Sequence, residues 1–393
     1  MMHGFEFYTP TRVIFGAGSL EKLPEAVGRC SAKRVFVIYG GQSAKKSGTL
    51  DLVEALLTGA GIAFAVIGGV KPNPRLGLAR EAIREAIAFG ADLILAVGGG
   101  SVIDTAKATA HGTANPEADI WDIWMGKVKL EKSLPVGVVL TIPAAGSEMS
   151  DSAVLTDEAA LAKRGLNTDL NRPAFALMDP ALAATLPARQ AACGVTDIMM
   201  HTLERYVNPL ENDMTDEIAE ALLRVVIRHG EAVVKNPGDI DAMSEIMWAG
   251  SLSHNNLTGL GGKKDFSVHQ FGQAIGEKFD IYHGETLSAM WASYARYVAP
   301  TNFARFARYA RNVWGVEEAD DEKAAMAGID ATEAYFKRLG MPVRIAELSC
   351  GVQDDAGLYD LALRCSRNRG RTIGSFRVLD FEDMRNVYQM ANK

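Results

Sequence analysis

The 393-residue sequence has only four cysteines, no Cys-x-x-Cys pair and no excess of basic residues. The cysteines are far apart, which excludes a disulfide framework and a zinc ribbon. Acidic residues outnumber basic ones by 48 to 41 and the net charge is -7, so we expect neither nucleic acid nor an anionic membrane as a partner. No apolar run approaches the roughly 20 residues of a membrane-spanning helix, and the N-terminus lacks a secretory signal pattern. We therefore expect a reduced, soluble, cytoplasmic protein that acts on a small molecule.

Short apolar runs alternate with amphipathic stretches in the first half of the chain. The runs cover residues 34–41, 62–69, 92–100 and 136–143, and residues 45–60 and 76–89 have helical spacing. This alternation is typical of parallel strands joined by helices, so it predicts an open α/β sheet with helices on both faces. The segments FEFY and RVIF, joined at Pro10, predict a separate hairpin whose unpaired edge would suit a second subunit.

The second half of the chain has a different composition. After Asp179 the β-branched runs disappear, and Ala, Leu, Glu, Arg and Met dominate segments such as 216–234 and 241–252. Pro180 and Pro187 would interrupt a continuing helix, so we place the domain boundary near them. The sequence thus predicts an α/β domain with a parallel sheet over residues 1–182 and an all-helical domain over residues 183–393.

A glycine-rich turn follows the third apolar run and opens a helix. Gly98, Gly99, Gly100 and Ser101 leave the backbone open, so a diphosphate could reach the N–H groups and the positive end of the helix dipole. The spacing is not that of the Rossmann fingerprint, and no P-loop lysine follows. A nucleotide diphosphate fits this turn, and a tight turn without a ligand is the alternative.

Two more polar turns follow apolar runs. The turn after residue 39 contains Gly40 and two nearby lysines but no carboxylate to accept ribose hydroxyls, which favours NADP over NAD. A solvated first turn of a helix is the alternative there. The turn at 141–148 places Thr141 and Ser147 at the carboxyl end of a strand, where open sheets bind ligands, and a capped helix start is its alternative.

Four residues in the second half have the chemistry of a metal site. Asp197 and His201 are four residues apart in a segment with helical periodicity, so both project from one face and can chelate one ion. His269 and His283 follow, separated by a helix-sized stretch. Three imidazoles and one carboxylate suit a divalent ion such as Fe(II) or Zn(II) and leave room for a substrate oxygen.

The other histidines have different interpretations. His3, His111 and His229 are interpreted as packed or surface residues, because an isolated histidine is more often one of these than a ligand. His254 either lines an active cleft or lies on a helix face. No Gly-x-Ser-x-Gly motif is present, so a serine hydrolase is not indicated.

Together these motifs resemble those of the iron-containing (group III) alcohol dehydrogenases, particularly the butanol dehydrogenase and NADPH-dependent aldehyde reductase branch. The resemblance spans nearly the whole chain. It rests on the opening FxFYxPTRVIFGxG, the YGGxS turn, Pro72-Asn73-Pro74, residues 98–107, the TIPAAGSE turn, residues 177–180 and the quartet Asp197, His201, His269 and His283. It implies a dehydroquinate-synthase-like fold, with an active cleft between a nucleotide-binding domain and a helical metal-binding domain.

The resemblance also implies roles for individual residues. The Asp197, His201, His269 and His283 quartet matches the family's metal ligands. The positions that match or adjoin its cofactor contacts are Gly40, Gly41, Ser43, Gly98, Gly99, Gly100, Ser101, Asp104, Thr141, Ser147 and Lys163. Gly40 stands where NAD-preferring relatives have an aspartate, which supports NADP(H) over NAD(H).

The proton relay is where the sequence departs from the family. Many relatives have a relay histidine where this chain has Gln273, and an amide does not titrate usefully. Proton transfer is therefore assigned to no certain side chain, with Gln273 and His254 as nearby candidates.

The expected activity is metal-dependent hydride transfer that interconverts primary alcohols and aldehydes, with NADP(H) preferred, in a homodimer. Two alternatives stay open. One is a non-redox, metal- and NAD-dependent sugar-phosphate cyclase or lyase on the same fold, for which the arginine run at 364–371 would hold a phosphate unless it forms a solvated face. The other is an inactive metal- or nucleotide-binding protein, for which Gln273 is the best argument.

Overall fold

The computed structural model describes residues 3–393 and divides into two compact units. The sheet unit comprises Tyr8–Leu186 and Pro237–Ser251. The helical unit comprises Pro187–Asn236, Leu252–Lys393 and the described residues up to Phe7. The predicted fold class, a parallel α/β sheet with a helical second half, is confirmed. The boundary between residues 182 and 183 stays a prediction.

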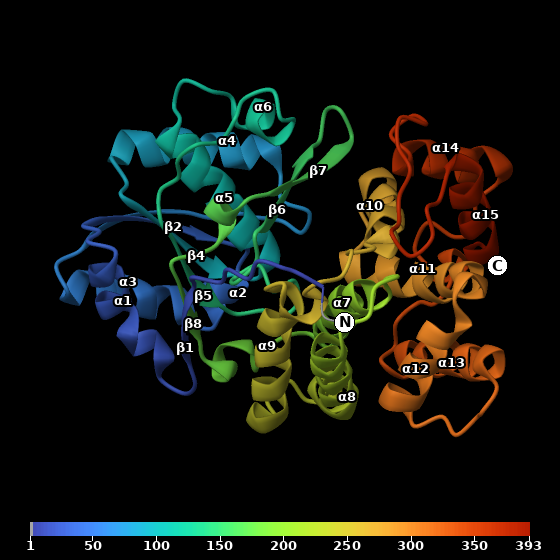
Figure 1. Ribbon diagram of the computed structural model, residues 1–393. Coiled ribbons are helices and arrows are strands. Elements are labelled where there is room, and N and C mark those ends of the chain that lie inside the picture. The colour runs from blue at the N-terminus through green and yellow to red at the C-terminus, as the bar shows by residue number, and fades with distance from the viewer. Residues whose placement is uncertain (1–2) are drawn as a thin grey trace. The chain divides into compact units, whose positions relative to one another are not determined.

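A six-stranded parallel sheet forms the centre of the sheet unit, in the order β1-β8-β5-β4-β2-β3 (Figure 1). The central strands β4 and β5 are buried along their whole length, as expected for parallel strands covered on both faces. The strands are β1 (Arg12–Phe15), β2 (Arg34–Tyr39), β3 (Ala63–Ile67), β4 (Leu93–Gly98), β5 (Val136–Leu140) and β8 (Phe175–Met178). The helices before residue 186 are α1 (Leu23–Arg29), α2 (Ser43–Lys46), α3 (Thr49–Gly59), α4 (Leu76–Phe89), α5 (Gly100–Ala114) and α6 (Ile120–Trp124).

The four apolar runs form β2, β3, β4 and β5, and the helix predicted at 76–89 is α4. The helix predicted at 45–60 is divided into α2 and α3 by Gly48, whose φ of 75° is left-handed. A hairpin of β6 (Ser152–Asp157) and β7 (Ala162–Asn167) pairs apart from the main sheet.

The predicted N-terminal hairpin is wrong. Residues 3–10 form no strand, and RVIF, as β1, pairs in parallel with β8 inside the main sheet. The Arg12 N–H donates to the Ala174 carbonyl at 3.0 Å, so the backbone of β1 finds its partners at the sheet edge. The pairing partner lies about 160 residues away along the chain, and local alternation does not reveal such a pairing.

The helical unit contains no named strand within its described residues. Its long helices are α7 (Ala188–Tyr206), α8 (Asp213–Lys235), α10 (Ser267–Phe279), α11 (His283–Val298), α12 (Phe303–Trp314), α13 (Asp321–Arg338), α14 (Asp355–Cys365) and α15 (Phe381–Ala391), and α9 (Ile240–His254) contributes its last residues. The helices predicted at 216–234 and 241–252 are α8 and α9. Short 3-10 helices lie at Ser19–Lys22, Asp169–Asn171, Pro180–Ala183, Leu257–Gly259, Ala299–Thr301 and Ile345–Glu347.

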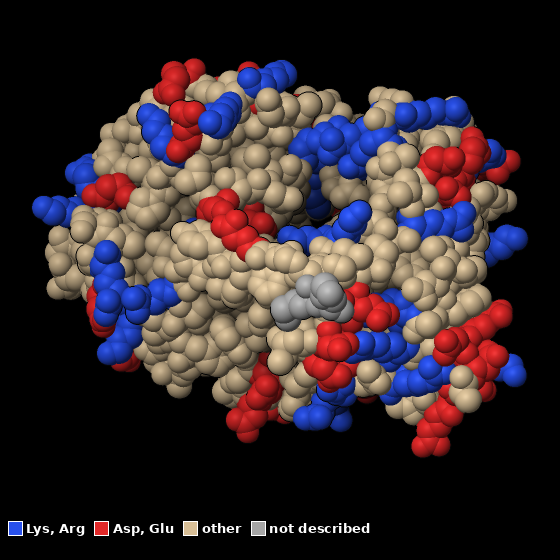
Figure 2. Space-filling model, in the orientation of Figure 1, with Lys and Arg blue, Asp and Glu red and all other residues tan. Residues whose placement is uncertain are grey.

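Acidic and basic side chains lie side by side over α12 and α13 on the face drawn in Figure 2. Arg311 there contacts Asp321 at 2.8 Å. Within residues 3–393, no helix combines the length and apolar character needed to cross a membrane. The four cysteines form no disulfide in this part of the chain.

Candidate metal centre and nucleotide turns

Asp197 and His201 lie one turn apart on α7, in a stretch of the helix that is buried on all sides. Asp197 Oδ1 is 3.6 Å from His201 Nδ1, and less than a tenth of either side chain is exposed. Neither of these two buried atoms has a hydrogen-bond partner. Because buried polar groups are nearly always paired, two orphaned atoms facing each other indicate that something else belongs between them.

The two later histidines converge on the same carboxylate. His269 lies in the first turn of α10, and its Nε2 is 3.5 Å from Asp197 Oδ1. His283 begins α11, and its Nε2 is 3.8 Å from the same oxygen. Ligand atoms of Asp197, His269 and His283 all lie within 4.8 Å of one another. His201 stands beside this group, its ring stacked on that of His269 with centroids 4.6 Å apart.

This donor set fits a divalent cation. One carboxylate and three imidazoles are the ligands that Zn(II) and Fe(II) accept, and a cation would satisfy the orphaned atoms. Burial holds the pKa of His201 well below its usual value, and the neighbouring histidines add to this, so His201 is neutral. Burial also opposes the charged form of His269, but the nearby Glu204 and Asp197 carboxylates outweigh it and raise its pKa to about 9.

Glu204, which the sequence reasoning missed, contacts His269 from the side opposite the carboxylate of Asp197. It is 1% exposed, and its Oε1 accepts the N–H groups of Val268 at 2.5 Å and His269 at 3.2 Å. Its Oε2 is hydrogen-bonded to Nδ1 of His269. Burial raises the pKa of the Glu204 carboxyl. The spacing of Asp197, His201 and Glu204 along one helix face is a signal that could have found it.

Glycines at the helix crossings bring these elements close together. A Cβ on Gly284 would lie 2.6 Å from the Cα of Cys193 on α7, and a Cβ on Gly272 would lie 2.6 Å from Thr286 Oγ1 on α11. Either atom would be too close for any real side chain, so α11 can approach α7 and α10 only with glycine at these positions. The close approach allows His269 and His283 to reach one carboxylate.

His254 and Gln273 have different surroundings. The centroid of the His254 ring lies 4.0 Å from that of the His201 ring, and whether His254 lines an active cleft stays a prediction. Phe266 is a further neighbour of the site that the sequence does not indicate. Its ring centroid lies 5.0 Å from that of His269. Its φ of 55° is unusual for a bulky residue. Gln273 lies one turn after His269 on α10 and donates to Glu277 Oε1 at 3.4 Å.

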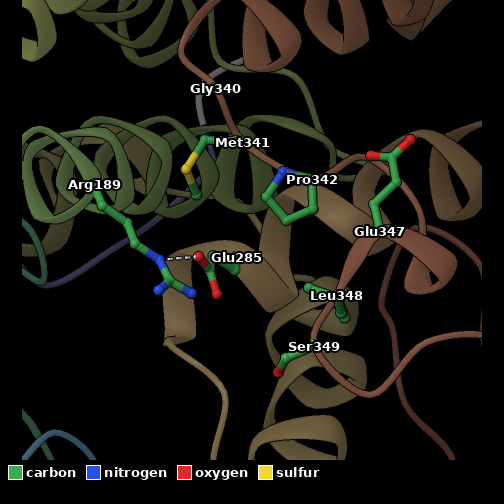
Figure 3. A pocket seen from close by; sticks show the side chains of 8 residues that line it. All are labelled: Arg189, Glu285, Gly340, Met341, Pro342, Glu347, Leu348 and Ser349. Carbon is green, nitrogen blue, oxygen red and sulfur yellow. Dashed lines mark hydrogen bonds and ion pairs between the residues drawn. The ribbon is translucent and has the colours of Figure 1, made fainter.

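A separate pocket of about 320 Å³ lies in the helical unit (Figure 3). In this view Arg189 and Glu285 point toward each other, and their ion pair measures 2.5 Å. Arg189 also lies over the ring of Tyr282, 4.8 Å from its centroid. None of the lining residues is a predicted ligand, so this pocket is not the metal cluster. Its ion pair instead ties the start of α7 to the segment around His283.

In the sheet unit, the glycine turn joins β4 to α5. A Cβ on Gly99 would lie 2.7 Å from Ile142 Cβ, and one on Gly100 would lie 2.9 Å from Ala145 Cβ. The turn thus needs glycine for its own packing, which is the ligand-free interpretation. It also presents the first N–H groups of a 15-residue helix, so the diphosphate interpretation stays a prediction.

Asp104, Lys107 and Ser147 form a polar network behind this turn. Ser147 Oγ donates to Asp104 Oδ1 at 2.7 Å, and Lys107 Nζ donates to Ser147 Oγ at 2.8 Å. Burial lowers the pKa of Lys107 to about 8, although Asp104 opposes the shift. Asp104 and Ser147 therefore hold the loop after β5 onto α5, and their contact with a cofactor stays a prediction.

The other proposed cofactor residues also belong to the sheet unit. Gly40, Gly41 and Ser43 follow β2, and Thr141 follows β5. Because β5, β4 and β2 are neighbours in a parallel sheet, their carboxyl ends share one edge, where open sheets bind ligands. Lys163 comes from β7 instead, and its Nζ donates to Asn73 Oδ1 at 3.1 Å.

The arginine run before α15 has partners within the helical unit. Arg364 donates to Asp360 at 3.0 Å, Arg369 lies 3.9 Å from the ring centroid of Phe381, and Arg371 donates to Gln270 at 2.6 Å. These contacts give the run a structural role that needs no phosphate.

Comparison with known proteins gives one family. Residues 10–180 match the family model described as iron-containing alcohol dehydrogenase, and residues 190–392 match the C-terminal model of the same family. The chain is 35% identical to NADH-dependent butanol dehydrogenase A of Clostridium acetobutylicum, over 99% of this chain and 100% of that protein. It is 32% identical to NADPH-dependent aldehyde reductase YqhD of Escherichia coli, with the same coverage.

A solved structure agrees with these matches. The crystal structure of NADH-dependent butanol dehydrogenase A from Thermotoga maritima superposes with a TM-score of 0.95 at 32% identity, covering 100% of this chain and 99% of that one.

Proposed function

Because the chain belongs to the iron-containing alcohol dehydrogenase family, we propose that it interconverts primary alcohols and aldehydes by metal-dependent hydride transfer, with NADP(H) preferred. Oxidoreduction of alcohols and aldehydes linked to NAD(P) is what the relatives' names have in common. The observation that carries the metal-dependent part is the set of buried, unpaired atoms Asp197 Oδ1, His201 Nδ1 and His269 Nε2 around one point. Such a set costs stability unless a cation fills it.

The proposed metal ligands are Asp197, His201, His269 and His283. A divalent ion held by them, Fe(II) or Zn(II), would polarise the carbonyl oxygen of the substrate while the nicotinamide supplies the hydride. His201, neutral because of its burial, is in the protonation state that a ligand needs.

Two side chains, Gln273 and His254, are candidates for a role in proton transfer. Gln273 can hold a water molecule but cannot carry a proton, because an amide does not titrate usefully. His254, whose ring contacts that of His201, is the titratable candidate of the two.

The proposed cofactor site lies at the carboxyl edge of the sheet. Gly98, Gly99, Gly100 and Ser101 would receive the diphosphate at the start of α5. The preference for NADP(H) is supported by the turn after β2, in which Gly40, Gly41 and Ser43 offer no carboxylate to repel a 2′-phosphate. The relatives' names include both NADH- and NADPH-dependent enzymes, so this turn, rather than family membership, is the argument.

We expect the protein to be a cytoplasmic homodimer. β1 is an edge strand of the six-stranded sheet. Phe15 on this strand and Tyr8 shortly before it are exposed at 42% and 52%. An edge of this kind pairs readily with a second copy. Light scattering of the purified protein should give twice the chain mass of 42.3 kDa, and a monomer would refute the dimer.

The test of the activity is a panel of aldehydes with each reduced cofactor, on protein reconstituted separately with Fe(II) and Zn(II). We expect one NADPH oxidised per aldehyde reduced, a lower kcat/KM with NADH, and loss of activity on chelation. No aldehyde reduction with either metal would refute the function. Turnover without net NADPH consumption would instead indicate a cyclase or lyase.

A further inference from the structure

We propose that Glu204 is a positioning residue that fixes the tautomer of His269, keeping the proton on Nδ1 and leaving Nε2 unprotonated toward a divalent cation. The inference deepens the proposed function and rests on it for the identity of the site. It concerns a residue that touches neither substrate nor cation, and it assigns a purpose to a carboxylate buried in the interior of the helical unit.

The hydrogen bonds of Glu204 decide which groups donate. Its Oε1 accepts the backbone N–H groups of Val268 and His269, and these belong to the first turn of α10. First-turn N–H groups have no partner within their own helix, and the positive end of the helix dipole favours a carboxylate there. Both backbone partners can only donate, so Oε1 of Glu204 is held as an acceptor.

The tautomer of His269 follows from this arrangement. Oε2 of the same side chain is hydrogen-bonded to Nδ1 of His269. An ionised carboxylate has no proton to give, so with Glu204 ionised it is Nδ1 that donates in this bond. A neutral imidazole has one N–H. With the proton on Nδ1, the lone pair of Nε2 points toward Asp197 Oδ1, which is 3.5 Å away. Nε2 is buried and lacks a hydrogen-bond partner, and it belongs to the ligand cluster. The carboxylate thus aims the lone pair at the place where the cation would lie.

The start of α10 is anchored from a second side. The Asp265 N–H donates to the Glu204 carbonyl at 2.9 Å, and the Asp265 side chain accepts the Ser267 N–H at 3.1 Å and the Tyr294 hydroxyl at 2.6 Å. Removing the charge on Glu204 should therefore leave the helix start in place. This makes Glu204→Gln a test of the tautomer rather than of folding.

Glutamine has nearly the shape of glutamate but only one acceptor oxygen. If that oxygen receives the two backbone N–H groups, the amide NH2 donates to Nδ1 of His269 and moves the imidazole proton to Nε2, where it blocks a metal bond. If the amide is reversed, two backbone N–H groups face an NH2 donor and lose their cap. In either case we expect E204Q to weaken Zn(II) binding by about 10- to 100-fold.

Glu220→Gln is the matched control. Glu220 lies in the same unit, is 1% exposed, and accepts hydrogen bonds from the Tyr206 hydroxyl and from Arg308, both at 2.8 Å. Its side-chain hydrogen bonds go to Tyr206, Arg308 and Asn312 and not to a histidine. E220Q removes an equally buried charge. We expect it to lower the stability of the protein while the Kd for Zn(II) stays the same within a factor of about two.

Two measurements test the proposal: the Kd for Zn(II), from competition with a chromophoric chelator, and the tautomer of His269, from long-range ¹H–¹⁵N spectra of histidine-labelled protein. The spectra are recorded on metal-free protein at a pH where the imidazoles are neutral. We expect the Nδ1–H form in the parent protein and in E220Q. In E204Q we expect the Nε2–H form, because the two backbone N–H groups favour the orientation in which the amide oxygen faces them and the NH2 group faces Nδ1.

An Nε2–H tautomer in the parent protein would overturn the proposal, as would a Kd for E204Q equal to that of E220Q. The tautomer is read without metal or substrate. A parent protein that shows the Nδ1–H form but reduces no aldehyde would therefore refute the proposed function and leave the role of Glu204 standing.

Discussion

Replacing Gly284 by alanine tests whether the close crossing of two helices assembles the metal site. The new Cβ would lie 2.6 Å from both the Cα and the carbonyl oxygen of Cys193, which are backbone atoms of α7 and cannot rotate away. Since ordinary contact begins at 3.4 Å, the two helices must separate by about 0.8 Å, the difference between these distances. Overpacking of this kind costs roughly 1–3 kcal/mol of unfolding free energy.

The separation acts directly on the ligands. His283 is the residue before Gly284, and Asp197 lies one turn after Cys193, so the shift moves a nitrogen and an oxygen of the cluster apart. Metal–ligand distances tolerate only about 0.2 Å. We therefore expect the Kd for Zn(II) to rise at least about tenfold, equivalent to about 1.4 kcal/mol.

Gly276→Ala is the matched control, because Gly276 lies on the neighbouring helix α10 and its Cβ would come no closer than 3.8 Å, to the Ile281 carbonyl. We expect G276A to keep the Kd and to gain up to about 1 kcal/mol from helix propensity. Urea unfolding of the metal-free proteins and chelator competition measure both quantities. A folded G284A protein that binds Zn(II) as tightly as G276A would show that the close helix crossing is not needed to assemble the site.

Three further expectations concern other parts of the molecule. A Cβ on Gly40 would meet only ordinary contacts, the nearest at 3.6 Å, so Gly40→Asp should fold and shift the kcat/KM ratio from NADPH toward NADH; an unchanged ratio would contradict the placement of the 2′-phosphate. Burial lowers the pKa of His111 to about 4, so the unfolded chain binds its proton first on acidification, and unfolding free energy should fall by about 2 kcal/mol between pH 7 and pH 4.5. Urea unfolding at both pH values should show a smaller fall in His111→Gln, and an equal fall would contradict this. Arg305→Met would remove two hydrogen bonds of 2.6 Å to the buried Asp216 and leave it with the more distant Arg308, 3.5 Å away. This should cost about 3 kcal/mol by urea unfolding, and a loss below about 1 kcal/mol would show that the pair is not needed.

The sequence was sufficient where the signal is local. The central strands β4 and β5 are continuous apolar runs because both of their faces are buried, and α4 has one apolar stripe, so the patterns identified them directly. The pairing of β1 with β8 could not be found in this way. β8 has only four residues, and its partner lies at the other end of the unit's sequence.

In the candidate site too, local patterns revealed some residues, and others depend on contacts between distant segments. Asp197 and His201 reveal themselves by helical spacing, and with His269 and His283 they form a chemically recognisable set. The bond between Glu204 and His269 depends on where α10 begins, 63 residues further along the chain, which the pattern around Glu204 does not contain. The left-handed backbone of Phe266 is likewise set by surrounding contacts and has no signal in the sequence.

Anomalous diffraction from crystals grown with Zn(II) would locate the proposed metal in the helical unit. We expect one zinc peak per chain at about 2.0–2.2 Å from an oxygen of Asp197 and from one nitrogen each of His201, His269 and His283. A peak bound elsewhere, or these four side chains turned away from one another with no metal between them, would show that they are not the metal ligands.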